Sequence, residues 1–171
     1  LSQASTSTAG ALTLSGSAGV IASTLTAQAA NNATINGGST VTVTTTGQTT
    51  GTVGVGATVN PTGAVTVSTT GNYTDGADLT LGAVTVRGGT SNSVTTATGI
   101  TATETTAALT DTSNYTQILP AITFTGTATT TDATISQAAA VAEVQGVAAV
   151  AAVTETGTVT FSAITNGQTI I

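Results

Sequence analysis

The chain has 171 residues, of which 39% are hydrophobic and 5% are charged, and its formal net charge is −6. Arg87 is its one basic residue and it has no His or Cys, which excludes a nucleic-acid footprint of clustered Lys and Arg, disulfides, and metal sites of thiolates or imidazoles. Without His and Lys the usual general bases are missing, and nothing activates the many Ser and Thr hydroxyls, so we expect no catalytic residues and no enzyme.

The hydrophobic residues are mostly small, and Thr is the most frequent residue type. The aromatic residues are Tyr73, Tyr115, Phe124 and Phe161. Small apolar side chains make a thin core, and β-branched residues pack well on a pleated surface. We therefore expect an all-β fold, either a parallel β-solenoid-like stack or a β-sandwich of short Val/Thr strands.

The first part of the chain shows weak alternation of apolar and polar residues. The stretches "GALTLSGS" (10–17) and "VIASTLTAQ" (20–28) each predict a short strand. Asn31-Asn32 and Asn36-Gly37-Gly38 are turn signals on either side of a further short β run.

A Val-Thr-Val motif then recurs in residues 37–47, 61–71 and 81–89. In each copy the two valines share one face of a strand and the Thr residues share the other. The first valines of the copies, Val41, Val65 and Val84, are 24 and then 19 residues apart. Such a spacing is close to one coil of a β-solenoid, although it is irregular. Residues 51–59, "GTVGVGATV", predict another strand that approaches a neighbouring backbone closely.

Six further stretches predict strands: 78–82, 93–97, 99–104, 122–129, 158–164 and 168–171. Asn166-Gly167 lies between the last two, and this dipeptide between apolar strands is a strong hairpin signal. The sequence therefore predicts at least one antiparallel strand pair, which favours a sandwich over a pure solenoid.

Residues 136–153, "SQAAAVAEVQGVAAVAAV", break the alternating pattern. Val recurs there every three residues among many alanines, a period that does not suit a strand. Ser136 fits the N-cap position and Ala favours helix, so we expect a short Ala-rich helix near 137–152. The alternative is an extended apolar segment that inserts into the sheet of a neighbouring molecule.

We interpret residues 1–171 as one β-rich structural domain, with a sub-boundary near 130–136. The chain contains no Met, its start lacks the features of a signal peptide, and no apolar run is long enough for a transmembrane helix. We expect it to be a mature form or a segment of a larger or polymeric surface protein, without a membrane span.

Residues 27–71 begin with "AQAANN", continue with a glycine pair and the "VTV" run, and end with "STTG". This stretch resembles the Thr/Ala/Gly-rich β region of bacterial surface-layer (S-layer) proteins of the Caulobacter type. The resemblance implies a secreted, largely β-structured protein that tiles the outer surface of a Gram-negative cell as a two-dimensional lattice. Family members are exported in one step and assemble with calcium, which they bind through glycine-rich nonapeptides of the form GGxGxDxUx. This chain contains no such nonapeptide.

Two kinds of candidate site remain. Asp75 and Asp78 in "YTDGADLTL" (73–81) are candidate Ca²⁺ ligands, since hard cations bind carboxylate and carbonyl oxygens. The alternative is a turn in which the Asp side chains accept local hydrogen bonds. Asn32, Asn72 and Asn114 begin Asn-x-Thr sequons and are candidate glycosylation sites, although such tripeptides also arise by chance in a Thr-rich chain. We expect no other cofactor.

The first 74 residues carry no charge, and exposed strand edges normally need charge to prevent pairing between molecules. We therefore expect an extracellular, cell-surface structural protein that assembles with copies of itself through sheet edges and faces, with cell-surface polysaccharide as a further candidate partner. One alternative is the subunit of an extracellular filament or pilus joined by a donated β-strand. A second is an adhesin module with a β-sandwich fold.

Overall fold

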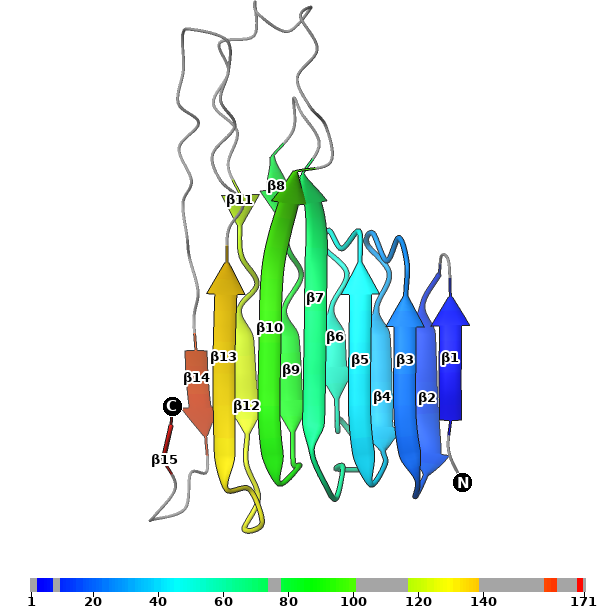
Figure 1. The fold of residues 1–171 in the computed structure, drawn as a ribbon, viewed down its shortest axis with the longest axis vertical. Coiled ribbons are helices and arrows are strands. Elements are labelled where there is room, and N and C mark those ends of the chain that lie inside the picture. The colour runs from blue at the N-terminus through cyan, green and yellow to red at the C-terminus, as the bar shows by residue number, and fades with distance from the viewer. Residues whose placement is uncertain are drawn as a thin grey trace, which may run out of the picture.

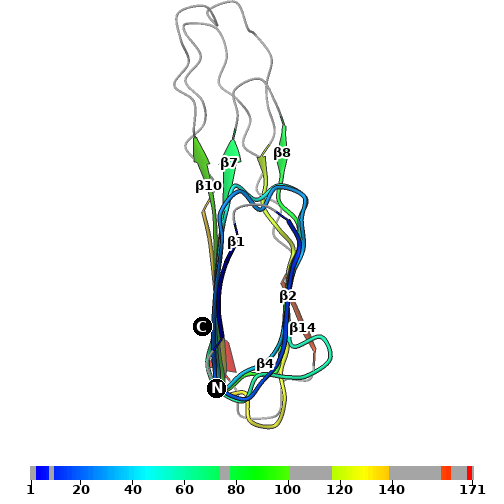
Figure 2. The ribbon, with the colours of Figure 1, turned by 90° about the vertical axis from the view of Figure 1, so that its right-hand side faces the viewer.

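The structure, a computed structural model, describes residues 3–7, 10–73, 78–100, 117–138, 159–162 and 169–170. In these residues the chain winds as a flattened coil, with one strand of each turn in a front sheet and one in a back sheet (Figures 1 and 2). All described strand pairs are parallel. The prediction of an all-β, solenoid-like fold is confirmed, and the antiparallel form of the sandwich is wrong.

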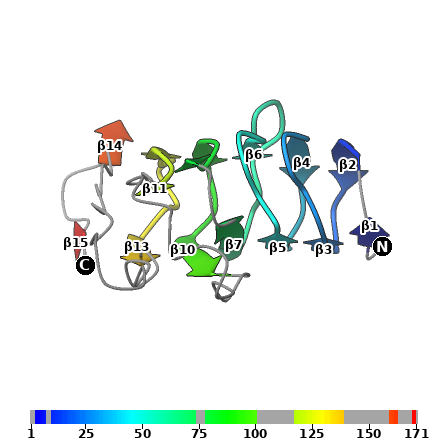
Figure 3. The ribbon, with the colours of Figure 1, turned by 90° about the horizontal axis from the view of Figure 1, so that it is seen from above.

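The front sheet has seven strands, in the order β1 (Gln3–Ser7), β3 (Val20–Leu25), β5 (Thr40–Thr46), β7 (Val65–Tyr73), β10 (Ser91–Ile100), β13 (Asp132–Ala138) and β15 (Thr169–Ile170). The back sheet has six, in the order β2 (Leu12–Ser17), β4 (Ala33–Gly37), β6 (Val53–Val55), β9 (Val84–Arg87), β12 (Ile122–Thr125) and β14 (Val159–Ser162). The short strands β8 (Leu79–Thr80) and β11 (Gln117–Ile118) form a separate pair. Seen from above, the two sheets lie face to face along the whole stack (Figure 3).

Successive coils lengthen along the chain. In the front sheet Ile21 is aligned with Val41, Val41 with Val65, Val65 with Asn92, and Asn92 with Ala133, so the repeat grows from 20 to 24, 27 and 41 residues. Parallel strands tolerate this variation because the extra residues lie in the connections and leave the strand register unchanged.

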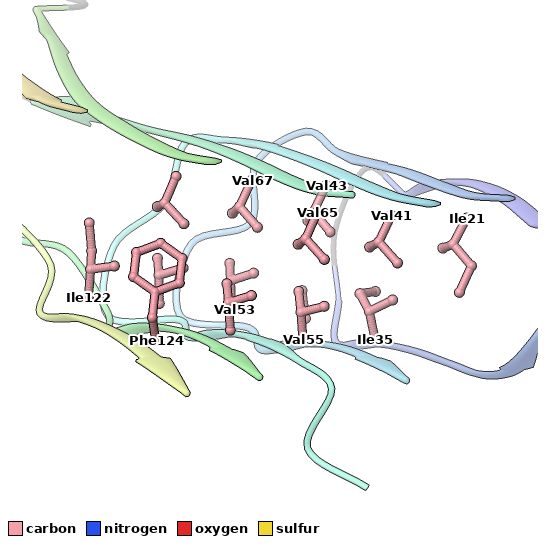
Figure 4. Packing of buried hydrophobic residues seen from close by; sticks show 14 of the residues in the cluster. Ile21, Ile35, Val41, Val43, Val53, Val55, Val65, Val67, Ile122 and Phe124 are labelled. Atoms are coloured by element: carbon pink, nitrogen blue, oxygen red, sulfur yellow. The ribbon is translucent and has the colours of Figure 1, made fainter. Parts of the chain in front are cut away.

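The alternation of Val and Thr places one apolar row of each strand inside the coil. Equivalent inward positions of neighbouring coils lie side by side and form apolar rows (Figure 4). The front sheet contributes Ile21, Val41 and Val65, then Val43, Val67 and Val94; the back sheet contributes Ala33, Val53, Val84 and Ile122, then Ile35, Val55, Val86 and Phe124. The core is as thin as the small side chains predict, because it is a single layer between two sheets.

Two predictions from the sequence are wrong for reasons of tertiary context. β14 and β15, the strands on either side of Asn166-Gly167, do not form a hairpin: β14 pairs in parallel with β12 in the back sheet and β15 with β13 in the front sheet. The parallel partners offered by the preceding coil outweigh the local turn preference.

The Ala-rich helix does not begin where it was predicted. Ser136 is inside β13, which pairs with β10, and is therefore no N-cap. Residues 139–153 lie outside the described residues, and the described residues contain no helix. β13 also covers most of the predicted sub-boundary near 130–136, and its pairing with β10 places it in the front sheet.

The Val-Thr-Val motif is not a marker of one coil. Its first two copies occupy β5 and β7, which are neighbours in the front sheet. The third copy is β9 in the back sheet, where Val84 is aligned with Val53 and Ile122. The interval from Val65 to Val84 is therefore a crossing between sheets rather than a full turn. Residues 93–97 and 99–104, predicted as two strands, share the single strand β10 up to Ile100.

Candidate functional site

The two ends of the stack are the first candidate site. β1 and β2 close the N-terminal end, and β15 and β14 close the C-terminal end (Figures 1 and 3). Among the described strands nothing pairs with the outer edge of any of these four. Their sequences, "QASTS", "LTLSGS", "VTFS" and "TI", contain no charged residue. These edges therefore lack the charges that normally prevent pairing with another molecule.

The registers of the two ends match. In the front sheet one aligned row runs from Gln3 in β1 to Ile170 in β15, and in the back sheet one runs from Leu12 in β2 to Val159 in β14. A second copy placed on either end would continue both rows, because every interface between coils is the same parallel pairing.

The outer face of the front sheet is the second candidate site. Its strands lie almost directly behind one another when the stack is viewed along its length, so the sheet has little twist (Figure 2). The residues between the inward valines are Thr and Ser in most strands. The result is a flat face whose side chains are mainly hydroxyls.

A third polar feature is buried and was missed by the sequence reasoning. Gln48 Nε2 donates to the carbonyl oxygens of Gly51 at 2.7 Å and Gly82 at 3.0 Å, so one side chain binds two successive coils. Gln28 repeats this one coil earlier, donating to Asn31 O at 2.9 Å and Thr52 O at 3.4 Å. Both Gln side chains are fully buried. A signal existed, since the two residues are one coil apart and each binds the carbonyl three residues later.

Next to the Gln residues the inward row of the front sheet is hydroxylic. Thr45, Thr69 and Thr96 are aligned with one another and are at most 1% exposed. Their Oγ1 atoms have no hydrogen-bond partner among the described residues. These groups carry a desolvation cost but no titratable function, so we assign them to the interior of the coil rather than to a catalytic centre.

The predicted calcium ligands are not brought together. Asp75 lies outside the described residues, and Asp78 is exposed immediately before β8. Within the described ranges no three His, Cys, Asp or Glu residues lie close enough to form a metal site. Arg87, the only base, is exposed at the end of β9.

The three candidate glycosylation sites have different settings. Asn32 is exposed, and its Oδ1 accepts hydrogen bonds from Thr52 N at 2.9 Å and Thr52 Oγ1 at 3.0 Å. This side chain therefore joins two adjacent coils. Asn72 has its backbone in β7, and Asn114 lies outside the described residues.

No protein-family model matches the chain, and no curated protein matches it significantly. No helix in the described segments is long and apolar enough to cross a membrane. The geometry of the stack, with its open ends and its hydroxylic face, is therefore the basis on which a function can be proposed.

Proposed function

We propose that this chain is a structural protein that assembles with copies of itself into an extracellular surface layer. The observation that supports this most directly is the pair of open, uncharged ends whose strand registers match. Copies join end to end when β1 and β2 of one molecule pair with β15 and β14 of the next. Contacts between sheet faces then hold neighbouring stacks side by side.

Two properties of the chain support assembly over a monomeric role. The contact between copies repeats the contact between coils, so it needs no new kind of surface. It is also heterologous, because one end meets the other, and such contacts propagate rather than close on themselves. The scarcity of charge, 5% of all residues, leaves little repulsion to oppose contact between copies.

A filament is the second candidate function. The coils stack along one axis, and growth at the two ends alone extends the molecule in one dimension. In the donated-strand version an N-terminal segment would complete the sheet of the next subunit. In this structure β1 pairs with β3 of its own chain, so donation requires that pairing to be exchanged between molecules.

Electron microscopy and sedimentation of the full chain test the proposal, with calcium and after chelation. We expect ordered assemblies from the natural sequence and mostly monomers from the double variant Thr6→Lys, Thr13→Lys, which adds charge to both strands of the N-terminal end. The matched control is Thr85→Lys, which adds the same charge in β9, in the middle of the stack. End-to-end assembly should persist in this control.

The outcomes separate the candidates. A planar lattice supports the surface layer, and a lattice that dissolves on chelation adds calcium to its contacts. Thin filaments unaffected by chelation favour the filament, and loss of those filaments on deletion of residues 1–25 is required by strand donation. A protein that stays monomeric at high concentration with calcium present would overturn the proposal.

A further inference from the structure

The outer face of the front sheet carries two aligned rows of hydroxyl side chains. One row runs through six consecutive strands without a break: Thr6, Thr24, Thr44, Ser68, Thr95 and Ser136. The other, two residues earlier on each strand, contains Thr42, Thr66, Ser93 and Thr134. Their described members are exposed or half-buried, so they form a continuous hydroxyl surface.

The spacing of this surface is regular in both directions. Adjacent strands are ~4.8 Å apart, and alternate residues along a strand are ~6.6 Å apart. The pairings from β1 to β13 run without a register shift. The sheet also has little of the twist that usually rotates successive strands (Figure 2). The hydroxyls therefore form a nearly planar rectangular grid.

The side chains on this grid are rigid and almost uncharged. Thr is restricted at χ1, so little conformational freedom is lost when its hydroxyl is held by a partner. In the described strands of the front sheet Asp132 is the only charged residue, and its Oδ1 accepts a 2.7 Å hydrogen bond from Ser91 Oγ. Each Thr also presents a methyl group beside its hydroxyl, which makes the face partly apolar.

We propose that this face binds the surface of an ice crystal. The oxygen positions of hexagonal ice repeat at distances close to both spacings of the grid, so many hydroxyls can occupy lattice positions at once. A rigid grid suits such a ligand because each single contact is weak and only their simultaneous formation gives affinity. Charged groups would orient water around themselves and disturb the match, and the two rows contain none.

The back sheet supplies an internal comparison. Its corresponding outward row passes through Thr13, Thr34, Gly54, Thr85 and Thr123, so a glycine interrupts the hydroxyls. Arg87 lies two residues beyond Thr85 on the same face, and the β2–β4 pairing contains a register shift between Leu14 and Ser17. The back face therefore lacks the continuity, neutrality and regularity of the front face.

The test is thermal hysteresis and inhibition of ice recrystallisation, measured on the full chain. We expect the natural sequence to shape growing ice crystals and Thr66→Lys to lower this activity about tenfold, which corresponds to a loss of ~1.4 kcal/mol of binding free energy. Thr42→Lys, on the neighbouring strand, should have a similar effect. Thr85→Lys adds the same charge to the back face and should leave the activity unchanged. Circular dichroism checks that each variant is folded.

Three outcomes would overturn the proposal. The first is a folded natural protein that neither shapes ice nor inhibits its recrystallisation. The second is an equal loss of activity in Thr66→Lys and Thr85→Lys, which would show that the front face is not the binding surface. The third is a change in the sedimentation of Thr66→Lys without a change in ice activity, which would make this face a contact between copies. None of these depends on whether the stacks assemble end to end.

Discussion

The interior of the coil is filled in two different ways along the strands of the front sheet. Toward the strand starts the inward residues are mostly apolar, as in the rows through Val41 and Val43. Toward the strand ends the same inward face carries Thr45, Thr69 and Thr96, followed by Gln28 and Gln48 where the chain crosses to the back sheet. The first region is held by apolar burial and the second by hydrogen bonds between coils, so substitutions should act on them differently.

The largest effect is expected in the apolar region. Phe124 is 3% exposed and is aligned with Val86 of the preceding coil. Phe124→Ala should lower the free energy of unfolding by about 3–5 kcal/mol, because it removes buried contacts and leaves a cavity. Urea denaturation measures this, with the neighbouring outward residue changed in Thr123→Ala as the control. A loss for Phe124→Ala no larger than that of the control would contradict an apolar core at this point.

The polar region depends on close approach between coils, which predicts the next effect. A Cβ on Gly82 would overlap the carbonyl oxygens of Thr50 and Gly51, whereas a Cβ on Gly54 would lie 4.0 Å from its nearest neighbour, Ala33 O. Gly82→Ala should cost about 2–3 kcal/mol of stability, because the backbone must shift.

Gly54→Ala is the matched control for this comparison. It should be neutral or slightly stabilising, since Gly inside a strand is less favourable than Ala. Equal melting temperatures for the two variants in a thermal unfolding experiment would show that the coils are not in close contact at Gly82.

The Gln side chains test the hydrogen bonds directly. Gln48→Ala should lower the free energy of unfolding by about 2 kcal/mol, because two buried carbonyl oxygens lose their donor. Gln28→Ala should cost about half as much, since one of its two bonds is 3.4 Å long. Chemical denaturation of both variants measures the difference. The reverse order would indicate that the tie between Gln48 and Gly82 contributes little.

The smallest effect also has the sharpest sign. Thr69 Oγ1 is buried without a partner among the described residues, so Thr69→Val should raise stability by about 1 kcal/mol. Thr130 is a buried Thr whose hydroxyl donates to Gly89 O at 2.7 Å and accepts from Thr127 N at 2.9 Å. Thr130→Val should therefore lower stability by about 1 kcal/mol. If both variants are destabilised equally in differential scanning calorimetry, the Thr69 hydroxyl is satisfied.

Local patterns were a good guide to the strands and a poor guide to their partners. Alternating Val and Thr predicted β5, β7 and β9 and the inward side of each. β13 was missed, because Ser136 and the alanines after it favour helix while the edge of β10 offers a parallel partner. The Asn166-Gly167 hairpin was predicted from local turn chemistry, which carries no information about the coil beneath it.

The candidate surfaces divide in the same way. The absence of charge that makes the strand edges open to other molecules is visible in the printed sequence. The matching registers of the two ends, and the row of six hydroxyls on the front sheet, are not. Neither surface includes the predicted calcium ligands Asp75 and Asp78, whose joint role the described residues leave untested.

The sequence by itself determined that the chain forms strands with one apolar and one hydroxylic side, because a period of two places alternate residues on opposite faces whatever lies next to them. Only the tertiary structure decided which Thr residues are buried and which are exposed. Thr44 and Thr45 are adjacent in one strand, yet the first joins the outer hydroxyl row and the second is fully buried. The reason is that coils of 20 to 41 residues share one register, and this alignment depends on the parallel partner rather than on local sequence.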